Sequence, residues 1–157
     1  MKKKIYIVGA SSGIGLELVN LLKDHSELYT ASRNPGPLSE MGIPHTRLDV
    51  TDAEINLDGI PEDLDGFIYC PGSINLKPFK MLSLDAFQQD LELNFTGLVK
   101  VLKEVMPKLR EGASLVFFST VAVGTGMPFH TSVAAAKGAI EGFARALAAE
   151  YAPKFRV

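Results

Sequence analysis

Short apolar runs alternate along this chain with segments of helical spacing, and this alternation constrains the fold more than any other feature. Strands are expected at residues 4–9, 27–33, 43–50, 65–72 and 113–120. Helices are expected between and after them, over residues 15–25, 83–109 and 130–151, and Ser83 is expected to cap the second of these helices. Strands connected through helices pair in parallel, because each connection must cross the sheet. The sequence therefore predicts a doubly wound parallel sheet in a three-layer α/β/α arrangement.

Length and composition narrow the class of protein further. A chain of 157 residues predicts one domain over residues 1–157, and a net charge of −2 argues against a nucleic-acid surface. The apolar stretch after the N-terminal lysines is too short to cross a membrane. The single cysteine, Cys70, allows no internal disulfide and no metal cluster, which fits a cytoplasmic setting. A sixth strand would begin at Phe155, so we expect the sheet to be truncated before its last strands.

A glycine-rich turn, GASSGIG over residues 9–15, separates the first predicted strand from the first predicted helix. Gly9 allows a tight turn, and Gly13 and Gly15 leave the helix N-terminus free of side chains. Free backbone N–H groups and the helix dipole then face an anion, which in this position is usually a pyrophosphate. The alternative is a glycine-rich turn without a ligand, but the placement between strand and helix favours a dinucleotide site in a Rossmann fold.

The glycines follow the spacing GxxxGxG, and further motifs occur in a fixed order: LDVTD with Asp49, YCPG at residues 69–72, LNFTG with Asn94, and FFSTVA followed by AAAKGA. With these motifs the whole chain resembles the short-chain dehydrogenase/reductase family. The resemblance implies an oxidoreductase that transfers hydride between a nicotinamide cofactor and a carbonyl or alcohol carbon of a small molecule. The cofactor-binding residues it implies are Gly9, Ser11, Ser12, Gly13, Ile14, Gly15, Ser32, Arg33, Asp49, Val50, Cys70, Pro71, Gly72 and Lys137.

The end of the second strand indicates which cofactor is preferred. A site for NAD places an acidic residue here to bind the ribose 2′-hydroxyl, whereas this chain has Ser32 and Arg33. A guanidinium pairs with a 2′-phosphate, so we expect NADP(H) rather than NAD(H). The alternatives are that Arg33 is a surface residue in a loop and that Asp49 only caps the following turn.

The family's catalytic positions are only partly retained. The resemblance assigns Lys137 to the nicotinamide ribose, Thr120 to the substrate oxygen and Asn94 to a water-linked proton path. The family's tyrosine, four residues before the lysine, is its proton donor. Here that position is Val133, a hydrocarbon that cannot donate a proton.

Other residues are candidate replacements for the tyrosine. His130 precedes Lys137 by two helical turns and carries a ring that titrates near neutrality, although a histidine bonded to loop backbone is the plainer interpretation. Ser119 and Ser132 form a pair shifted by one residue, and Tyr151 lies about four helical turns away. Two functions therefore remain open: an NADP(H)-dependent oxidoreductase with an atypical site, or a non-catalytic NADP(H)-binding sensor or partner subunit. By the resemblance, residues 83–109 and 130–151 would pair in a homodimer or homotetramer.

Overall fold

The computed structural model describes residues 2–55 and 57–157, and it confirms the predicted doubly wound parallel sheet. The strands are β1 (Lys3–Val8), β2 (Ser26–Ser32), β3 (His45–Arg47), β4 (Leu64–Tyr69) and β5 (Leu109–Phe117). They pair in parallel in the order β3-β2-β1-β4-β5. The order reverses between β1 and β4, and ligands bind at this switch point in open α/β sheets.

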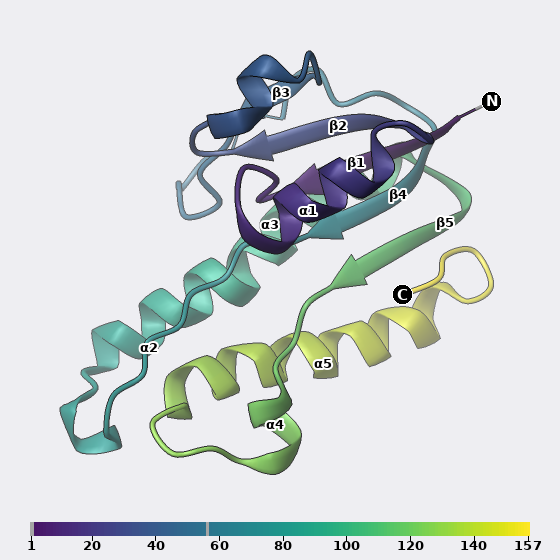
Figure 1. Cartoon of the computed structure of the whole chain (residues 1–157). Coiled ribbons are helices and arrows are strands. Elements are labelled where there is room, and N and C mark those ends of the chain that lie inside the picture. Colours follow the sequence, from purple (N-terminus) through teal and green to yellow (C-terminus); the bar gives the residue numbers. More distant parts are fainter. Residues whose placement is uncertain (1, 56) are drawn as a thin grey trace.

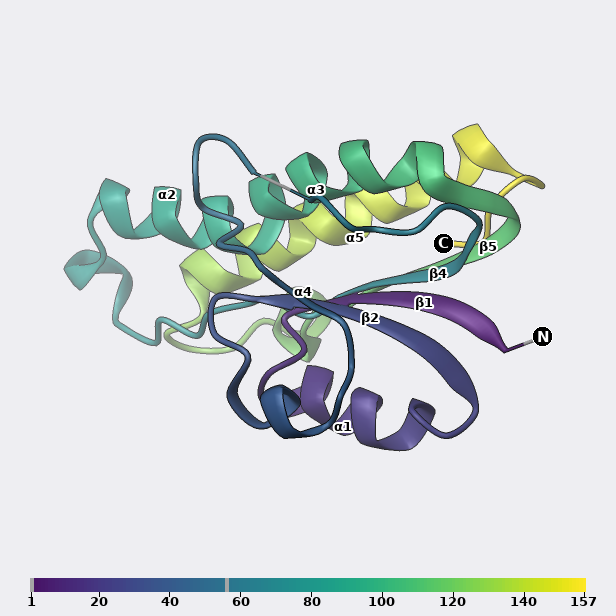
Figure 2. The ribbon, with the colours of Figure 1, turned by 90° about the horizontal axis from the view of Figure 1, so that it is seen from above.

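Helices cover the sheet on both faces (Figures 1 and 2). α1 (Gly13–Leu22) lies on one face, and α3 (Gly97–Val105) and α5 (Thr131–Tyr151) lie on the other. Successive strand residues alternate between the two cores: Tyr6 and Val8 of β1 belong to the core under α3 and α5, whereas Ile7 belongs to the core under α1. Burial of both faces explains why these strands are almost wholly apolar.

The edge of the sheet departs from the predicted pattern. Residues 113–117 of β5 are apolar nearly throughout, as in a strand covered on both faces, but Val116 is 42% exposed, because the strand residues of the α1 core belong to β1, β2 and β4. The predicted sixth strand is present as one parallel bridge, in which Arg156 pairs with Ser114. The amide of Leu115 donates to the Arg156 carbonyl at 2.7 Å.

The prediction of one continuous helix over residues 83–109 is wrong. The segment is divided into α2 (Leu84–Leu91), the π-helix η3 (Glu92–Thr96), α3 and a 3₁₀ turn, η4 (Met106–Lys108), and β5 already begins at Leu109. The predicted Ser83 cap is present, since its side chain accepts from the Ala86 amide. The π-helix inserts one residue and shifts the apolar face, so that Leu98, Val101 and Val105 are buried while Phe87 stays half-buried.

Three shorter helices complete the structure. They are the 3₁₀ turns η1 (Gly36–Glu40) and η2 (Phe79–Met81), and α4 (Val121–Thr125) after β5. Among the described residues, no helix is both long and apolar enough to cross a membrane.

Candidate functional site

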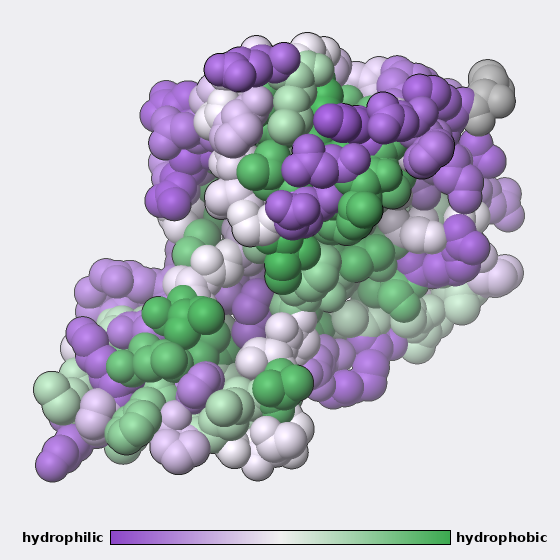
Figure 3. Space-filling view, viewed as in Figure 1, coloured by the Kyte–Doolittle hydropathy of each residue, from purple (hydrophilic) through white to green (hydrophobic). Residues whose placement is uncertain are grey.

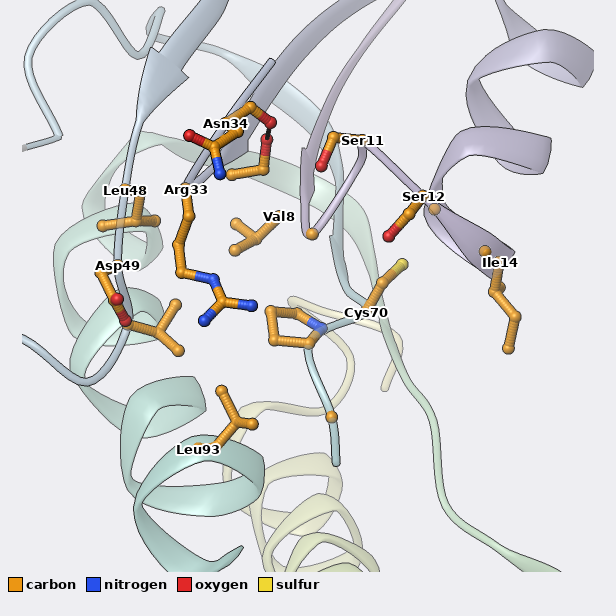
Figure 4. Close-up of a pocket in the computed structure, with 17 residues that line it drawn as sticks. Val8, Ser11, Ser12, Ile14, Arg33, Asn34, Leu48, Asp49, Cys70 and Leu93 are labelled. Atoms are coloured by element: carbon orange, nitrogen blue, oxygen red, sulfur yellow. Dashed lines mark hydrogen bonds between the residues drawn. The ribbon is translucent and has the colours of Figure 1, made fainter. Parts of the chain in front are cut away.

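One pocket lies over the carboxyl ends of β1, β2 and β4, with a volume of about 330 Å³ (Figure 4). This volume falls within the range of small-molecule sites. Every residue predicted to bind the cofactor, apart from Lys137, lines this pocket. These residues are Gly9, Ser11, Ser12, Gly13, Ile14, Gly15, Ser32, Arg33, Asp49, Val50, Cys70, Pro71 and Gly72. Strand ends far apart in the sequence thus meet at one place, as the parallel topology requires.

Four lining residues were missed by sequence reasoning. Val8, Asn34, Leu48 and Leu93 also line the pocket. Each is the immediate neighbour of a residue that the motifs had identified. Including the sequence neighbours of each motif residue would therefore have found them.

The glycine turn has the predicted anion-binding geometry, but Gly15 serves a different purpose from the one expected. Gly13 has a φ of +52° and open space where a side chain would be, which leaves the first turn of α1 accessible. At Gly15, by contrast, a Cβ would lie 2.1 Å from the Gly9 carbonyl oxygen. Gly15 is thus required for packing of α1 against the turn. The Ser12 side chain does not cap α1, so the helix N–H groups remain available to an anion.

Arg33 and Asp49 shape the other end of the pocket. Figure 4 shows the Arg33 side chain extending from the end of β2 into the pocket, between Asp49 and Cys70. Asp49 caps the turn that follows it, accepting from the Thr51 amide at 3.0 Å and from the Thr51 hydroxyl at 2.7 Å. These bonds, together with the charges of Arg33 and Arg47, hold the pKa of Asp49 below its usual value. Asp49 therefore both caps a turn and lines the pocket.

Ser32 lines the pocket, but its hydroxyl is hydrogen-bonded within the protein. Its hydroxyl donates to the Asn34 carbonyl at 2.7 Å and lies 2.8 Å from His45 Nε2. Because the Ser32 proton is used for Asn34, Nε2 of His45 must donate in the second bond. Ser32 thus fixes the loop that carries Arg33, which leaves Arg33 as the side chain that enters the pocket.

Asn94 and Lys137 meet behind the pocket wall at Gly72. A Cβ built on Gly72 would lie 3.1 Å from Asn94 Oδ1 and 3.1 Å from Lys137 Nζ. Both side chains are buried, Asn94 at 0% exposure and Lys137 at 8%. Burial lowers the pKa of Lys137, an effect that the nearby Cys70 partly offsets. Lys137 lies outside the lining itself, directly behind Gly72.

Asn94 owes its position to the π-helix. The π-helical segment is closed by the Gly97 amide, which bonds to the Glu92 carbonyl five residues earlier. Tyr69 of β4 donates its hydroxyl to the Leu93 carbonyl at 2.9 Å. A Cβ on Gly97 would lie 2.8 Å from that same hydroxyl oxygen. Close packing against β4 thus holds the π-helix, a feature frequently found at functional sites.

The residues around Thr120 differ in how far their polar groups are engaged. Thr120 Oγ1 accepts from the Ala122 amide at 3.3 Å and caps α4, so its proton is free to donate to a substrate oxygen. Ser119 donates to Glu141 at 2.6 Å, and Ser132 is buried. In the shifted serine pair, the proton of the exposed Ser119 is thus bonded to Glu141, whereas the buried Ser132 hydroxyl has no hydrogen-bond partner among the described residues.

His130 is bonded to backbone, as the plainer interpretation expected. It is the N-cap residue of α5, and its Nδ1 lies 2.7 Å from the Pro128 carbonyl oxygen. Nδ1 must donate to that carbonyl, which leaves Nε2 as the second ring nitrogen. His130 does not belong to the pocket lining.

The four tyrosines of the chain lie in β1, β2, β4 and at the end of α5, and none is at position 133. Tyr6 and Tyr69 are buried, and burial raises the pKa of both well above the usual tyrosine value. Tyr29 donates to Glu27. Tyr151 stacks on Phe155 at 5.6 Å, at the far end of α5. Val133, at the position that the resemblance assigns to the tyrosine, is 4% exposed.

The described residues contain no group of three or more His, Cys, Asp or Glu side chains placed to hold a metal ion. Cys70, which lines the pocket, is a free thiol. Burial raises its pKa to about 11, an effect that the Lys137 charge opposes.

Comparison with known proteins agrees with the fold and the motifs. The chain is 30% identical over 172 residues to YusZ, an uncharacterized oxidoreductase of Bacillus subtilis. The alignment includes 98% of this chain and 61% of YusZ. It is 32% identical over 165 residues to human retinol dehydrogenase 8, covering 53% of that protein with 93% of its own length. The chain thus spans little more than half the length of these relatives.

Solved structures share the same architecture. A short chain dehydrogenase family protein from Francisella tularensis superimposes with a TM-score of 0.92 at 22% identity, over 100% of this chain and 67% of that one. Residues 3–157 match the sequence pattern described as short chain dehydrogenase. The chain therefore belongs to the short chain dehydrogenase family.

Proposed function

We propose that this chain binds NADP(H) and acts as an oxidoreductase. It would transfer hydride between that cofactor and a carbonyl or alcohol carbon of a small molecule. The observation that carries the proposal is the single pocket into which the glycine turn, Arg33 and the end of β4 converge. In support, a short chain dehydrogenase of Shigella flexneri has been solved with NADP, and it shares the fold at a TM-score of 0.89 and 23% identity.

Each part of the pocket would bind one part of the cofactor. The N-terminus of α1 would hold the pyrophosphate, because its backbone N–H groups are unpaired and its dipole favours an anion. The Arg33 guanidinium would pair with the 2′-phosphate. Lys137 would hold the nicotinamide ribose from behind Gly72. A bound nicotinamide would supply or accept the hydride.

On the substrate side, Thr120 would donate its free hydroxyl proton in a hydrogen bond to the substrate oxygen. His130 is the proposed proton donor, because its Nδ1 is fixed by the Pro128 carbonyl and its Nε2 remains available. With Nδ1 donating to the carbonyl, Nε2 carries a proton only when the ring is doubly protonated. That charged ring is a stronger acid than an alcohol.

A second function is favoured by Val133. A buried hydrocarbon at the tyrosine position, with the four tyrosines placed in β1, β2, β4 and at the end of α5, favours a chain that binds NADP(H) as a sensor or partner subunit without hydride transfer. The two functions predict the same cofactor binding and differ only in turnover.

Turnover separates them. We expect the wild-type protein to shift NADPH fluorescence and to oxidise NADPH with at least one member of a panel of aldehydes, ketones and quinones. Val133→Tyr is expected to raise this activity, whereas Val133→Phe, which adds the ring without the hydroxyl, is not. His130→Gln is expected to lower kcat while leaving the Kd for NADPH unchanged.

Binding without any oxidation across the panel would replace the enzyme by the second function. Absence of NADPH binding would contradict both.

We also propose that two copies pair through α2, α3 and α5. Figure 3 shows apolar side chains gathered at the end of the molecule formed by α2 and the loop before it. Ile74, Phe79 and Leu84 are 76%, 70% and 83% exposed, and such patches mark protein contacts. Light scattering during size-exclusion chromatography tests the proposal, and a monomer at micromolar concentration would contradict it.

A further inference from the structure

A buried carboxyl group lies close to the Asn94 and Lys137 pair without belonging to the glycine turn or to the family motifs. Asp90, near the end of α2, is 4% exposed. Its Oδ1 accepts a hydrogen bond of 2.6 Å from the Ser73 hydroxyl, and its Oδ2 has no partner among the described residues. Carboxyl groups are rarely buried without full pairing, so this one calls for a functional explanation.

Asp90 and Asn94 are linked through Ser73. The Asn94 amide nitrogen donates to Ser73 Oγ at 3.1 Å and to the Asp90 main-chain carbonyl at 2.8 Å. Since the Ser73 proton is already donated to Asp90, Ser73 can only accept from Asn94. The direction of the hydrogen bonds along this chain of groups is therefore set by the Asp90 carboxyl.

This direction determines which way the Asn94 amide faces. With Nδ2 held by Ser73 and by the Asp90 carbonyl, Oδ1 must point to the other side, where it approaches Gly72 and Lys137 Nζ. Oδ1 has no hydrogen-bond partner among the described residues. The negative end of a carbonyl dipole turned toward a buried ammonium favours the charged form of that ammonium.

We propose that Asp90 and Ser73 are positioning residues, which fix the Asn94 amide so that its Oδ1 is turned toward the side of Gly72 where Lys137 Nζ lies. In a site without the tyrosine, this arrangement places a carbonyl dipole near Lys137. The inference builds on the proposed cofactor site, but it concerns the placement of side chains in the free protein, where it can be measured.

The test is the titration of Lys137 in the protein without cofactor. Lysine ¹³Cε signals are followed by NMR against pH, with Lys137 assigned from the Lys137→Met variant. In Asp90→Ala the Ser73 hydroxyl can turn, so Asn94 Nδ2 keeps only the main-chain carbonyl of residue 90 as a fixed acceptor and the amide is held less firmly in its orientation toward Lys137. We expect the pKa of Lys137 to fall by about one unit and the Kd for NADPH to rise about tenfold.

Two further variants separate position from charge and from folding. Asp90→Asn keeps an acceptor for the Ser73 hydroxyl, so we expect it to restore the wild-type Lys137 pKa and NADPH affinity. Ser73→Ala removes the link with little change in volume and is expected to act in the same direction as Asp90→Ala. If Asp90→Ala does not fold, Ser73→Ala is the variant in which the Lys137 pKa and the NADPH affinity are measured.

A matched control is Ser83→Ala, which removes the N-cap of the same helix, α2, without touching Asn94. It is expected to lower the Tm while leaving the Lys137 pKa unchanged.

Three outcomes would overturn the inference: an unchanged Lys137 pKa in folded Ser73→Ala and Asp90→Ala, equal effects of Asp90→Asn and Asp90→Ala, or an equal shift in Ser83→Ala. Failure of the wild-type protein to bind NADPH would contradict the proposed function instead. In that case the Lys137 titration would still decide the inference.

Discussion

The two ends of the candidate site are built in contrasting ways. At the nucleotide end, the pocket is formed by backbone, glycines and short side chains of residues 9–15, with Arg33 reaching in from β2. At the reaction end, polar groups are buried: Asn94, Ser132 and Asp90 each carry an oxygen without a hydrogen-bond partner among the described residues. The nucleotide end is open and is built around one turn and the strand ends, whereas the reaction end is assembled from buried side chains of α2, the π-helix and α5.

This contrast predicts which substitutions would disrupt each end of the site. A pocket built of backbone depends on conformation, so it fails when a side chain is added at a close contact. A buried polar cluster depends on partners, so it fails when one member of a pair is removed. Three experiments sharpen this difference, in order of decreasing expected effect.

The largest effect is expected at Gly15. Gly15→Ala places a Cβ against the Gly9 carbonyl oxygen, a backbone atom that cannot move aside without opening the turn. We expect the free energy of unfolding in urea to fall by about 3 kcal/mol and NADPH binding to be lost.

Gly142→Ala is the control, because Gly142 lies within α5 with nothing within 4 Å of an added Cβ. It is expected to gain about 1 kcal/mol of stability. Wild-type stability and affinity in Gly15→Ala would show that the turn is not the rigid element described here.

An intermediate effect is expected at Arg33. Arg33→Ala should weaken NADPH binding about tenfold to a hundredfold, because the 2′-phosphate loses a charged partner, and it should leave NADH binding unchanged. Fluorescence titrations with both cofactors measure the difference. Arg47→Ala is a matched control, since Arg47 also lies near Asp49 but outside the pocket lining. Equal losses for NADPH and NADH would remove the argument for NADP(H).

The smallest effects are expected from pH at the reaction end, where Lys137 and Cys70 should act in opposite directions. Burial raises the pKa of Cys70 from 9.0 to about 11, so the folded protein keeps a proton that the unfolded chain releases. Stability relative to Cys70→Ala should therefore fall above pH 9, by about 1 kcal/mol at pH 10.

Lys137 has the reverse sign. Burial lowers its pKa below the usual 10.5, so the unfolded chain binds the extra proton as pH approaches that value. Stability relative to Lys137→Met should rise with pH in the window below 10.5. Urea unfolding of the three proteins across this range checks both signs. Parallel profiles would show that neither group is buried as described.

The glycine turn and the strand ends could be predicted from sequence because each depends on a few neighbouring residues. The apolar runs define the strands, and parallel pairing forces their carboxyl ends together, so Gly9, Arg33 and Gly72 must meet. The same reasoning located Ser83 as a helix cap. It failed for the helix over residues 83–109, because a π-helix differs from an α-helix by one residue and leaves no clear mark on apolar spacing.

The sequence by itself determined the parallel sheet, the anion-binding turn and the absence of tyrosine at position 133. These follow from apolar periodicity, glycine placement and residue identity, which are properties of short segments. Only the tertiary structure decided that Asn94 sits in a π-helix, that Gly15 serves packing and that Asp90 and Ser73 lie behind Asn94. The physical reason is that hydrogen bonds between residues 17 to 21 positions apart depend on how helices pack, and periodicity does not record that packing.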